Sequence, residues 1–310
     1  IRGEQAELSA EKEGIEKTLK SPARLKKLIR DELTADAEKY GDKRRTKIVE
    51  REAAQAIDET ELVTAEPVTV VLSSLGWVRQ ARGHDMDPRA LSYKTGDSFQ
   101  AAARGRSTQQ AVFVDSTGRA YSLPAHTLAS ARGQGEPLSG RLDPPDGAIF
   151  AAVLIGEPAD PWLLACDAGH GFIVKLEALY SRNKAGKAVF NLPGNAKVLA
   201  AAPVPADAGA LVVSVNSEGR LLAFPTTDLP EMDKGRGNLI FGVPGKKSRA
   251  GEELMVAATV IAPEQSVVVW CGDRKMTLAW KDLADYRGER SQRGSLLPRG
   301  WRKVDRLSVE

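Results

Sequence analysis

The sequence predicts an all-β disc of five similar units, preceded by a short α-helical segment. Three observations lead to this prediction. Residues 1–41 are rich in helix-forming residues, residues 62–310 alternate short Val- and Leu-rich runs with Gly, Pro and Asp turns, and the second pattern returns five times. The intervening residues 42–61 are charged and weakly periodic. They are expected to form a linker, with a short helix over residues 49–56.

The helical segment is predicted to contain two helices. An apolar stripe at helical spacing runs from Ile15 to Leu33. Ser21 and Pro22 interrupt it, and these residues suit the N-cap and the first position of a second helix. Gly41 suits the end of that helix, because glycine readily adopts the backbone conformation of a helix terminus.

Each of the five units contains a hydrophobic strand, a tight turn with glycine and a second strand, which together predict a β-hairpin. The turn glycines stand 42 to 53 residues apart, a spacing typical of the blades of a propeller. Two stacked β-sandwiches are the alternative arrangement. The turn glycines are Gly76, Gly118, Gly169 or Gly171, Gly219 and Gly272.

A further strand is expected before each hairpin from the second unit onward. The first unit has no such strand at residues 61–67. Residues 303–309 at the chain end have an alternating pattern, so they are predicted to pair with the first unit and close the ring. The four strands before hairpins are expected at residues 99–103, 149–154, 198–204 and 254–261.

A loop after each hairpin combines glycine with Lys or Arg. In units two to five the loop glycine follows the turn glycine by 15 to 17 residues, whereas the first unit has the poorer version Lys94-Thr95-Gly96-Asp97. Glycine lets the backbone approach a partner closely, and the neighbouring cation can meet a phosphate. A solvated basic turn is the alternative for any one loop. Repetition in every unit favours cations at regular steps around one rim.

The total charge gives no indication of a nucleic-acid partner. The chain has 44 basic and 41 acidic residues, a formal net charge of +3. Residues 1–61 alone carry 14 basic and 15 acidic residues. A basic surface must therefore come from where the cations lie rather than from their number.

Composition also limits the class of protein. No apolar run approaches the roughly 20 residues of a membrane span, and no signal peptide is evident at the start. The sequence begins with Ile1 rather than Met, which indicates a fragment of a longer chain; removal of the initiator Met by processing is the alternative. Cys166 and Cys271 lie in apolar strands, where buried inert thiols are expected, and they fit a reducing cytoplasm.

No catalytic or metal-binding motif stands out. The chain lacks a phosphate-loop motif, a complete dinucleotide fingerprint and the His-Glu-x-x-His pattern. His84, His126 and His170 are expected in loops or turns. The tryptophans at strand positions are expected in the core; they are Trp77, Trp162, Trp270 and Trp280.

Several longer segments carry a family resemblance. They include GWVRQARGHDMD from Gly76, VFVDSTGR from Val112, SARGQGEPL from Ser130 and DLPEMDKGRGN from Asp228. Residues 67–310 resemble the C-terminal domain of the A subunits of bacterial type IIA topoisomerases, in the topoisomerase IV group. Residues 1–61 resemble the end of the catalytic portion of those subunits. The resemblance implies a five-bladed β-pinwheel, a propeller-like disc with strand-exchanged blades, whose rim binds and bends duplex DNA.

The first loop separates this sequence from the gyrase group. Gyrase A subunits carry a Gly- and Arg-rich box in the first unit, and residues 92–97 stand in its place with one cation and one carboxylate. This departure argues against a gyrase-type DNA-wrapping domain, and it favours relaxation and decatenation. A protein-interaction propeller is the other alternative, which would need clusters of exposed aromatic residues.

The resemblance also implies the wider assembly. The chain would be a non-catalytic part of an ATP-dependent type II DNA topoisomerase. Its partners would be double-stranded DNA and, in an A2B2 heterotetramer, a second copy of the A subunit together with two B subunits. Mg2+ and ATP would bind outside this region, as would the nucleophilic tyrosine, and the location would be cytoplasmic, at the nucleoid. The candidate phosphate-binding residues are Arg79, Arg82, Lys94, Arg104, Arg106, Arg132, Lys184, Lys187, Lys234, Arg236, Arg287, Arg290 and Arg293.

Overall fold

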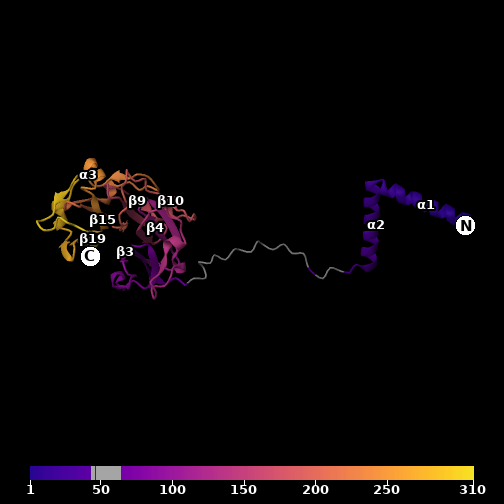
Figure 1. Cartoon of the computed structure of the whole chain (residues 1–310), viewed down its shortest axis with the longest axis horizontal. Helices are drawn as coiled ribbons and strands as arrows, with labels where there is room; N and C mark the ends of the chain where they lie inside the picture. The colour runs from indigo at the N-terminus through magenta and orange to yellow at the C-terminus, as the bar shows by residue number, and fades with distance from the viewer. Residues whose placement is uncertain (43–45, 47–63) are drawn as a thin grey trace. The chain divides into compact units, whose positions relative to one another are not determined.

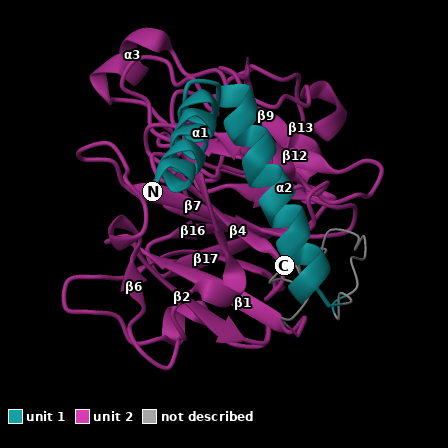
Figure 2. Cartoon of the chain, turned by 90° about the vertical axis from the view of Figure 1, so that its right-hand side faces the viewer, with its two compact units in different colours: residues 1–57 teal, residues 58–310 magenta. Residues whose placement is uncertain are grey.

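The computed structural model describes residues 1–42, 46 and 64–310 of the chain. The chain divides into two compact units, residues 1–57 and residues 58–310 (Figure 2). The expected linker at residues 42–61 lies almost entirely outside the described residues, and the short helix expected at 49–56 lies wholly outside them. Among the described helices none is both long and apolar enough to cross a membrane.

Residues 1–57 contain the two expected helices, α1 (Arg2–Leu19) and α2 (Pro22–Tyr40). Ser21 is extended and Pro22 opens α2, as the sequence predicts, because proline has no amide proton to leave unpaired at a helix start. No residue of either helix is buried, and apolar side chains such as Leu28 remain exposed.

Residues 64–310 form the pinwheel drawn in magenta to yellow in Figure 1, and they contain five β-hairpins. The predicted turn glycines lie between the hairpin strands, with Gly169 rather than Gly171 in the third turn. The first strand of each hairpin carries a run of buried, mostly apolar residues, because it lies in the interior of its sheet between the second hairpin strand and the inner strand. The hairpins are β1 (Pro67–Ser73) with β2 (Trp77–Arg82), β4 (Gln110–Asp115) with β5 (Arg119–Pro124), β8 (Pro161–Ala165) with β9 (His170–Lys175), β12 (Leu211–Asn216) with β13 (Arg220–Pro225), and β16 (Val267–Cys271) with β17 (Arg274–Leu278).

An inner strand completes each blade, and it comes after its hairpin in the chain. The expectation that these strands precede and join the next hairpin is wrong, because each pairs antiparallel with the first strand of the hairpin before it. Several of them are rich in alanine, and such small side chains let neighbouring blades approach closely. The inner strands are β3 (Phe99–Arg106), β7 (Phe150–Ile155), β11 (Ala202–Pro203), β15 (Met255–Ile261) and β19 (Arg306–Val309).

The C-terminal strand does not close the ring against the first unit, so that prediction is also wrong. β19 pairs with β16, with Val267 opposite Val309 and Trp270 opposite Arg306. It therefore has the same place in the fifth blade as β3 has in the first. The physical reason is that every hairpin takes its inner strand from the chain that follows it, and the fifth hairpin is followed by the chain end.

Short outer strands are exchanged between blades. Each of the first four blades receives its fourth strand from the unit that follows, paired with the second strand of its hairpin. Within the described residues the fifth sheet has three strands, in the order β17-β16-β19. This exchange confirms the predicted five-bladed, strand-exchanged pinwheel. The outer strands are β6 (Glu136–Pro137), β10 (Lys187–Ala188), β14 (Asn238–Leu239) and β18 (Ser295–Leu296).

The inner strands also define the two sides of the disc. One cavity is lined by the first residues of the inner strands, among them Gln100 and Ala151, and another by their last residues, among them Arg106 and Ile155. All five hairpin turns therefore lie on one side, which we call the turn face. Short 3-10 helices follow the hairpins on the other side; they are Ala125–Thr127, Leu176–Leu179, Thr226–Asp228 and Asp282–Tyr286.

The hydrophobic core lies between neighbouring blades. Phe172 of the third hairpin packs edge-on against Phe190, which follows the exchanged strand β10, with ring centroids 5.1 Å apart. Tyr121 packs in the same way against Phe150 of the inner strand β7 at 5.5 Å. Each exchanged segment therefore contributes aliphatic or aromatic side chains to the core as well as a strand. The remaining described helices are Pro88–Ala90, Leu138–Gly140 and α3 (Gly245–Ala250).

Candidate nucleic-acid interface

The Gly-and-cation loops of units two to five lead into the exchanged strands, so they lie along the outer edge of the preceding blade. A short pattern fixes them: a glycine, two strand residues and a buried aliphatic residue. The amide of that aliphatic residue donates to the carbonyl of the preceding hairpin's turn glycine, as Leu297 does to Gly219 at 2.8 Å. The equivalent donors in the other three loops are Leu138, Val189 and Ile240.

We call the contact between an exchanged loop and the hairpin of the preceding blade a blade joint. This contact requires the glycine that comes directly before each outer strand. Gly294 has a φ of 67°, and a Cβ there would overlap the carbonyl oxygen of Leu221. A Cβ on Gly186, whose φ is 69°, would overlap the ring of Tyr121. These glycines approach the neighbouring blade, and the blade joint alone accounts for their presence. The sequence pattern predicted that the backbone at these glycines approaches a binding partner closely. In the structure the group approached is the neighbouring blade of the same chain.

Arginines that sequence reasoning did not single out hold the exchanged loops in place. Arg119 donates from Nε to the carbonyl of Ala185 at 2.8 Å and from Nη2 to that of Gly186 at 3.0 Å. Arg220 donates to the carbonyl of Gly294 at 3.2 Å. The signal was present in the sequence, since each of these arginines directly follows a turn glycine.

Four of the predicted site residues have free side chains on the exchanged loops. All four are exposed, and within the described residues none has an ion pair or a side-chain hydrogen bond. They lie on the edges of blades one, two and three, because each loop is held by the preceding blade. We call them the rim cations; they are Arg132, Lys184, Lys234 and Arg236.

Two further predicted residues are free but lie elsewhere. Arg104 and Arg106 are exposed on the inner strand β3, opposite Thr69 and Pro67. Both line the cavity at the end of the inner strands, on the side away from the hairpin turns. The structure therefore does not bring them together with the rim cations.

Three predicted residues of the first unit are engaged within the fold. Arg79 is only 4% exposed, and it donates to the carbonyl of Gly133 at 3.1 Å. Arg82 forms an ion pair with Glu66 at 3.3 Å. The ammonium group of Lys94 lies 3.2 Å from the ring centroid of Trp77, a cation–π contact.

Three more predicted cations on the later loops are also engaged. Lys187 donates to the carbonyl of Ala178 at 2.8 Å. Arg290 donates to the carbonyl of Leu239, also at 2.8 Å. Arg287 is exposed and lies over the ring of Trp280, 5.4 Å from its centroid.

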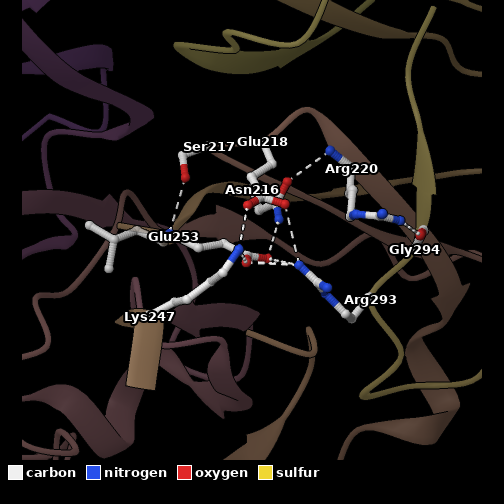
Figure 3. A network of polar contacts seen from close by, with 9 residues as sticks. Asn216, Ser217, Glu218, Arg220, Lys247, Glu253, Arg293 and Gly294 are labelled. Carbon is white, nitrogen blue, oxygen red and sulfur yellow. Dashed lines mark hydrogen bonds and ion pairs between the residues drawn. The ribbon is translucent and has the colours of Figure 1, made fainter. Parts of the chain in front are cut away.

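Arg293 belongs to a network around a buried carboxylate (Figure 3). Glu253 is fully buried, and Arg293 donates to its two oxygens at 2.7 and 2.8 Å. Asn216 donates to the same group at 2.8 Å, and Lys247 lies 3.4 Å from it. Glu218 pairs with both Lys247 at 2.9 Å and Arg293 at 3.3 Å. These contacts join the loop of unit five to the turn of blade four.

The first loop has a different position. Asp97 accepts hydrogen bonds from the hydroxyl of Ser74 and the amides of Leu75 and Ser98, so this loop folds onto the turn of its own blade. Burial acts to raise the pKa of Asp97, but the hydrogen bonds outweigh it and hold that pKa below its ordinary value. The carboxylate is thus committed to the fold.

The expected tryptophan positions are only partly confirmed. Trp162 is buried, at 7% exposure. Trp280 is half-buried and packs against the core of blades four and five, with Arg287 over its ring. Trp77 and Trp270 are half-buried and each carries a cation over its ring, so their placement in the core is wrong. They lie at surface positions where Lys and Arg side chains cover them.

Among the described residues no cluster of three or more potential metal ligands occurs, and the histidines and cysteines belong to none. Burial, and secondly Arg236, lower the pKa of His170. Burial raises the pKa of the Cys166 thiol to about 11, as expected for a thiol in a buried strand.

Comparison with known proteins assigns the chain to a family, although no family model matches it. Over its full length it is 53% identical to the A subunit of DNA topoisomerase 4 from Pseudomonas aeruginosa and 44% identical to that from Escherichia coli, and it spans 41% of each. The solved E. coli ParC C-terminal domain matches 79% of this chain and 99% of its own length, with a TM-score of 0.67 and 44% identity. The chain therefore belongs to the family of DNA topoisomerase 4 A subunits and contains their C-terminal domain.

Proposed function

We propose that residues 64–310 bind duplex DNA along the rim of blades one to three and bend it, without reading its sequence. The observation that carries this proposal is the set of rim cations, which are free, exposed and held at successive blade edges. Point charges at repeated spacing suit phosphates, and no base-specific group is needed to use them. The pinwheel fold shared with the ParC C-terminal domain supports the same function.

Bending follows from the curvature of the rim. Bending 20–30 base pairs by 40–90° costs on the order of 1–6 kcal/mol, so a single contact would not sustain it. The exchanged strands fix the loops to the blades, so the rim cations are positioned before DNA arrives and several can act together.

We place the chain in a complete enzyme that carries out ATP-dependent strand passage, namely decatenation and relaxation of supercoils during chromosome segregation. The chain spans about two fifths of its relatives, so the assembly of two A subunits with two B subunits, the Mg2+ and ATP sites and the nucleophilic tyrosine belong to this proposal. In this assembly the pinwheel binds DNA without performing chemistry, in the cytoplasm at the nucleoid.

A gyrase-type wrapping domain is less well supported. Wrapping needs strong contacts at the first unit, where the only lysine of the loop lies against Trp77 and Asp97 is held by the turn of blade one. A protein-interaction propeller is also less well supported, because the half-buried tryptophans of the described residues are covered by cations rather than gathered into an apolar patch.

The test is duplex binding by this chain at several salt concentrations, with two duplexes of unrelated sequence. If about six phosphates are neutralised, the logarithm of the binding constant falls with the logarithm of salt concentration at a slope near −5. Both duplexes should give the same slope and affinity. A flat salt dependence, or a strong preference for one sequence, would contradict the proposal.

A further inference from the structure

A second group of free cations lies on the turn face at blades four and five. Their segments precede inner strands: α3 lies before β15, and residues 298–303 lie before β19. All four side chains are exposed, and within the described part of the chain they have no ion pair or side-chain hydrogen bond. We call them the turn-face cations; they are Lys246, Arg299, Arg302 and Lys303.

Two contacts bring these segments together over a single hairpin turn, that of blade four. Lys247 of α3 pairs with Glu218 of the turn at 2.9 Å. The backbone of Arg302 lies so close to Gly219 that a Cβ on that glycine would overlap it. The helix and the later loop therefore flank the same turn, although Lys247 and Arg302 are 55 residues apart in the chain.

The local carboxylates do not cancel this charge. Glu218 and Glu253 are already paired with Lys247 and Arg293 (Figure 3). Three exposed carboxylates lie close to these segments in the sequence, namely Glu252, Asp273 and Asp305, and Asp305 already accepts a hydrogen bond from the backbone amide of Gly272. The four turn-face cations outnumber these three exposed carboxylates, so the surface keeps a positive excess.

The network around Glu253 joins this surface to the rim. Arg293 belongs to the exchanged loop of unit five, which follows the edge of blade four, and it shares Glu218 with Lys247 of α3. The rim itself changes here, because the predicted cations of this loop are engaged: Arg287 over Trp280, Arg290 with Leu239 and Arg293 with Glu253. Free positive charge therefore passes from the rim to the turn face at blade four.

We infer that a duplex bound along the rim of blades one to three leaves the rim at blade four and continues across the turn face, with its phosphates on the turn-face cations. This inference rests on the proposed function. DNA is favoured over an acidic protein because the surface consists of separate point charges, whereas protein interfaces centre on buried aromatic or aliphatic anchors. Among the described residues the exposed large apolar side chains near the hairpin turns are Leu75 and Ile149 at blades one and two and the single Leu296 on the edge of blade four, which do not form a cluster beside the turn-face cations.

The test compares two duplex lengths, about 15 and about 40 base pairs, bound to this chain and to the variant K246A/R302A/K303A. The short duplex fits on the rim alone, and the long one reaches the turn face. For the long duplex the salt slope of the variant should be smaller by about 3, one for each phosphate that the variant no longer neutralises. For the short duplex it should not change.

Controls separate this inference from the proposed function. The variant K175A/K275A/K281A removes the same charge from other surfaces of the pinwheel and should leave both slopes unchanged, and the charge-conserving R302K/K303R should bind like the wild type. Equal losses for both lengths, or no loss for either, would overturn the inference, and the second outcome would point to a protein partner. Loss of rim binding in R132A/K184A/K234A supports the proposed function independently; no loss there would refute it.

Discussion

The loop after the first hairpin and the loops after the other four share a Gly-and-cation pattern but are used differently. The later loops cross to the preceding blade, where they supply an outer strand and a buried aliphatic residue. Among the described residues no blade precedes the first hairpin, and the first loop folds back on its own hairpin turn through Asp97. The same residue types thus serve a blade joint in one region and a local cap in the other.

This difference shows that pattern alone does not determine which cations are available. On the first three exchanged loops the strand pairing holds the backbone, and the four rim cations among the predicted residues are left free. In the first unit Arg79, Arg82 and Lys94 are used by the carbonyl, carboxylate and ring that surround them. The two regions differ in how many cationic side chains are free. The cause of this difference is the way each backbone is held, not the number of Lys and Arg residues.

The largest expected effect comes from the glycine of a joint. Gly294→Ala should destabilise the pinwheel by about 3 kcal/mol, because the methyl group adds an overlap with Leu221 to the strain of a positive φ. Gly96→Ala in the first loop is the matched control: its φ is also positive, at 83°, but its surroundings are open, so the cost should be about 1 kcal/mol. Urea unfolding monitored by fluorescence measures both, and equal costs would mean that Gly294 is not at a close approach.

The next effect concerns the buried carboxylate of the blade-four joint. Glu253→Gln should cost about 2 kcal/mol, because Arg293 and Lys247 lose the charge that compensates them. The neighbouring Glu252 is exposed, so Glu252→Gln should change the free energy of unfolding by less than about 0.5 kcal/mol. Should the two variants unfold at the same urea concentration, the network would not be holding the loop.

The smallest effect is the pH dependence from His170, which occupies in blade three the place that arginine has in blades two and four. Its pKa is lowered in the folded state by burial and then by Arg236. A depressed histidine pKa means that protons favour the unfolded chain, so this contribution to stability is complete above the ordinary value of 6.5 and is lost as pH falls through it.

Unfolding at pH 7.5 and 5.5 should therefore differ less in His170→Gln than in the wild type, by at most about 1 kcal/mol. NMR titration gives a second measurement: removing the charge of Arg236 should raise the pKa of His170, and so should bound DNA if a phosphate meets that arginine. If neither the removal of the Arg236 charge nor the binding of DNA changes the pKa of His170, Arg236 lies away from His170 and from the DNA.

The parts of the fold that depend on local pattern could be predicted from the sequence. Ser21 and Pro22 indicated the helix break, and the turn glycines indicated five hairpins, because these features depend on residues close in the chain. The partner of each remaining strand could not be predicted in this way. Residues 306–309 can form a strand wherever an edge is open, and only the assembled blade shows that β16 supplies that edge.

The candidate site could be predicted to the level of its loops but not of its individual side chains. Arg293 and Arg236 look alike in the sequence, yet Arg293 meets Glu253, which lies 40 residues earlier and is brought there by strand exchange. Arg236 meets no such partner among the described residues. The family resemblance supplied the strand exchange itself, which spacing and hydrophobic pattern do not contain.

The central claim is that the free cations of the exchanged loops, rather than the engaged ones, bind DNA. The most direct measurement compares the salt slope of duplex binding for R132A/K184A/K234A/R236A with that for R82A/K94A/K187A/R287A, which removes the same charge from engaged residues. We predict that the first variant reduces the slope by about 4 and the second by less than about 1. Equal reductions in the two variants would contradict the account.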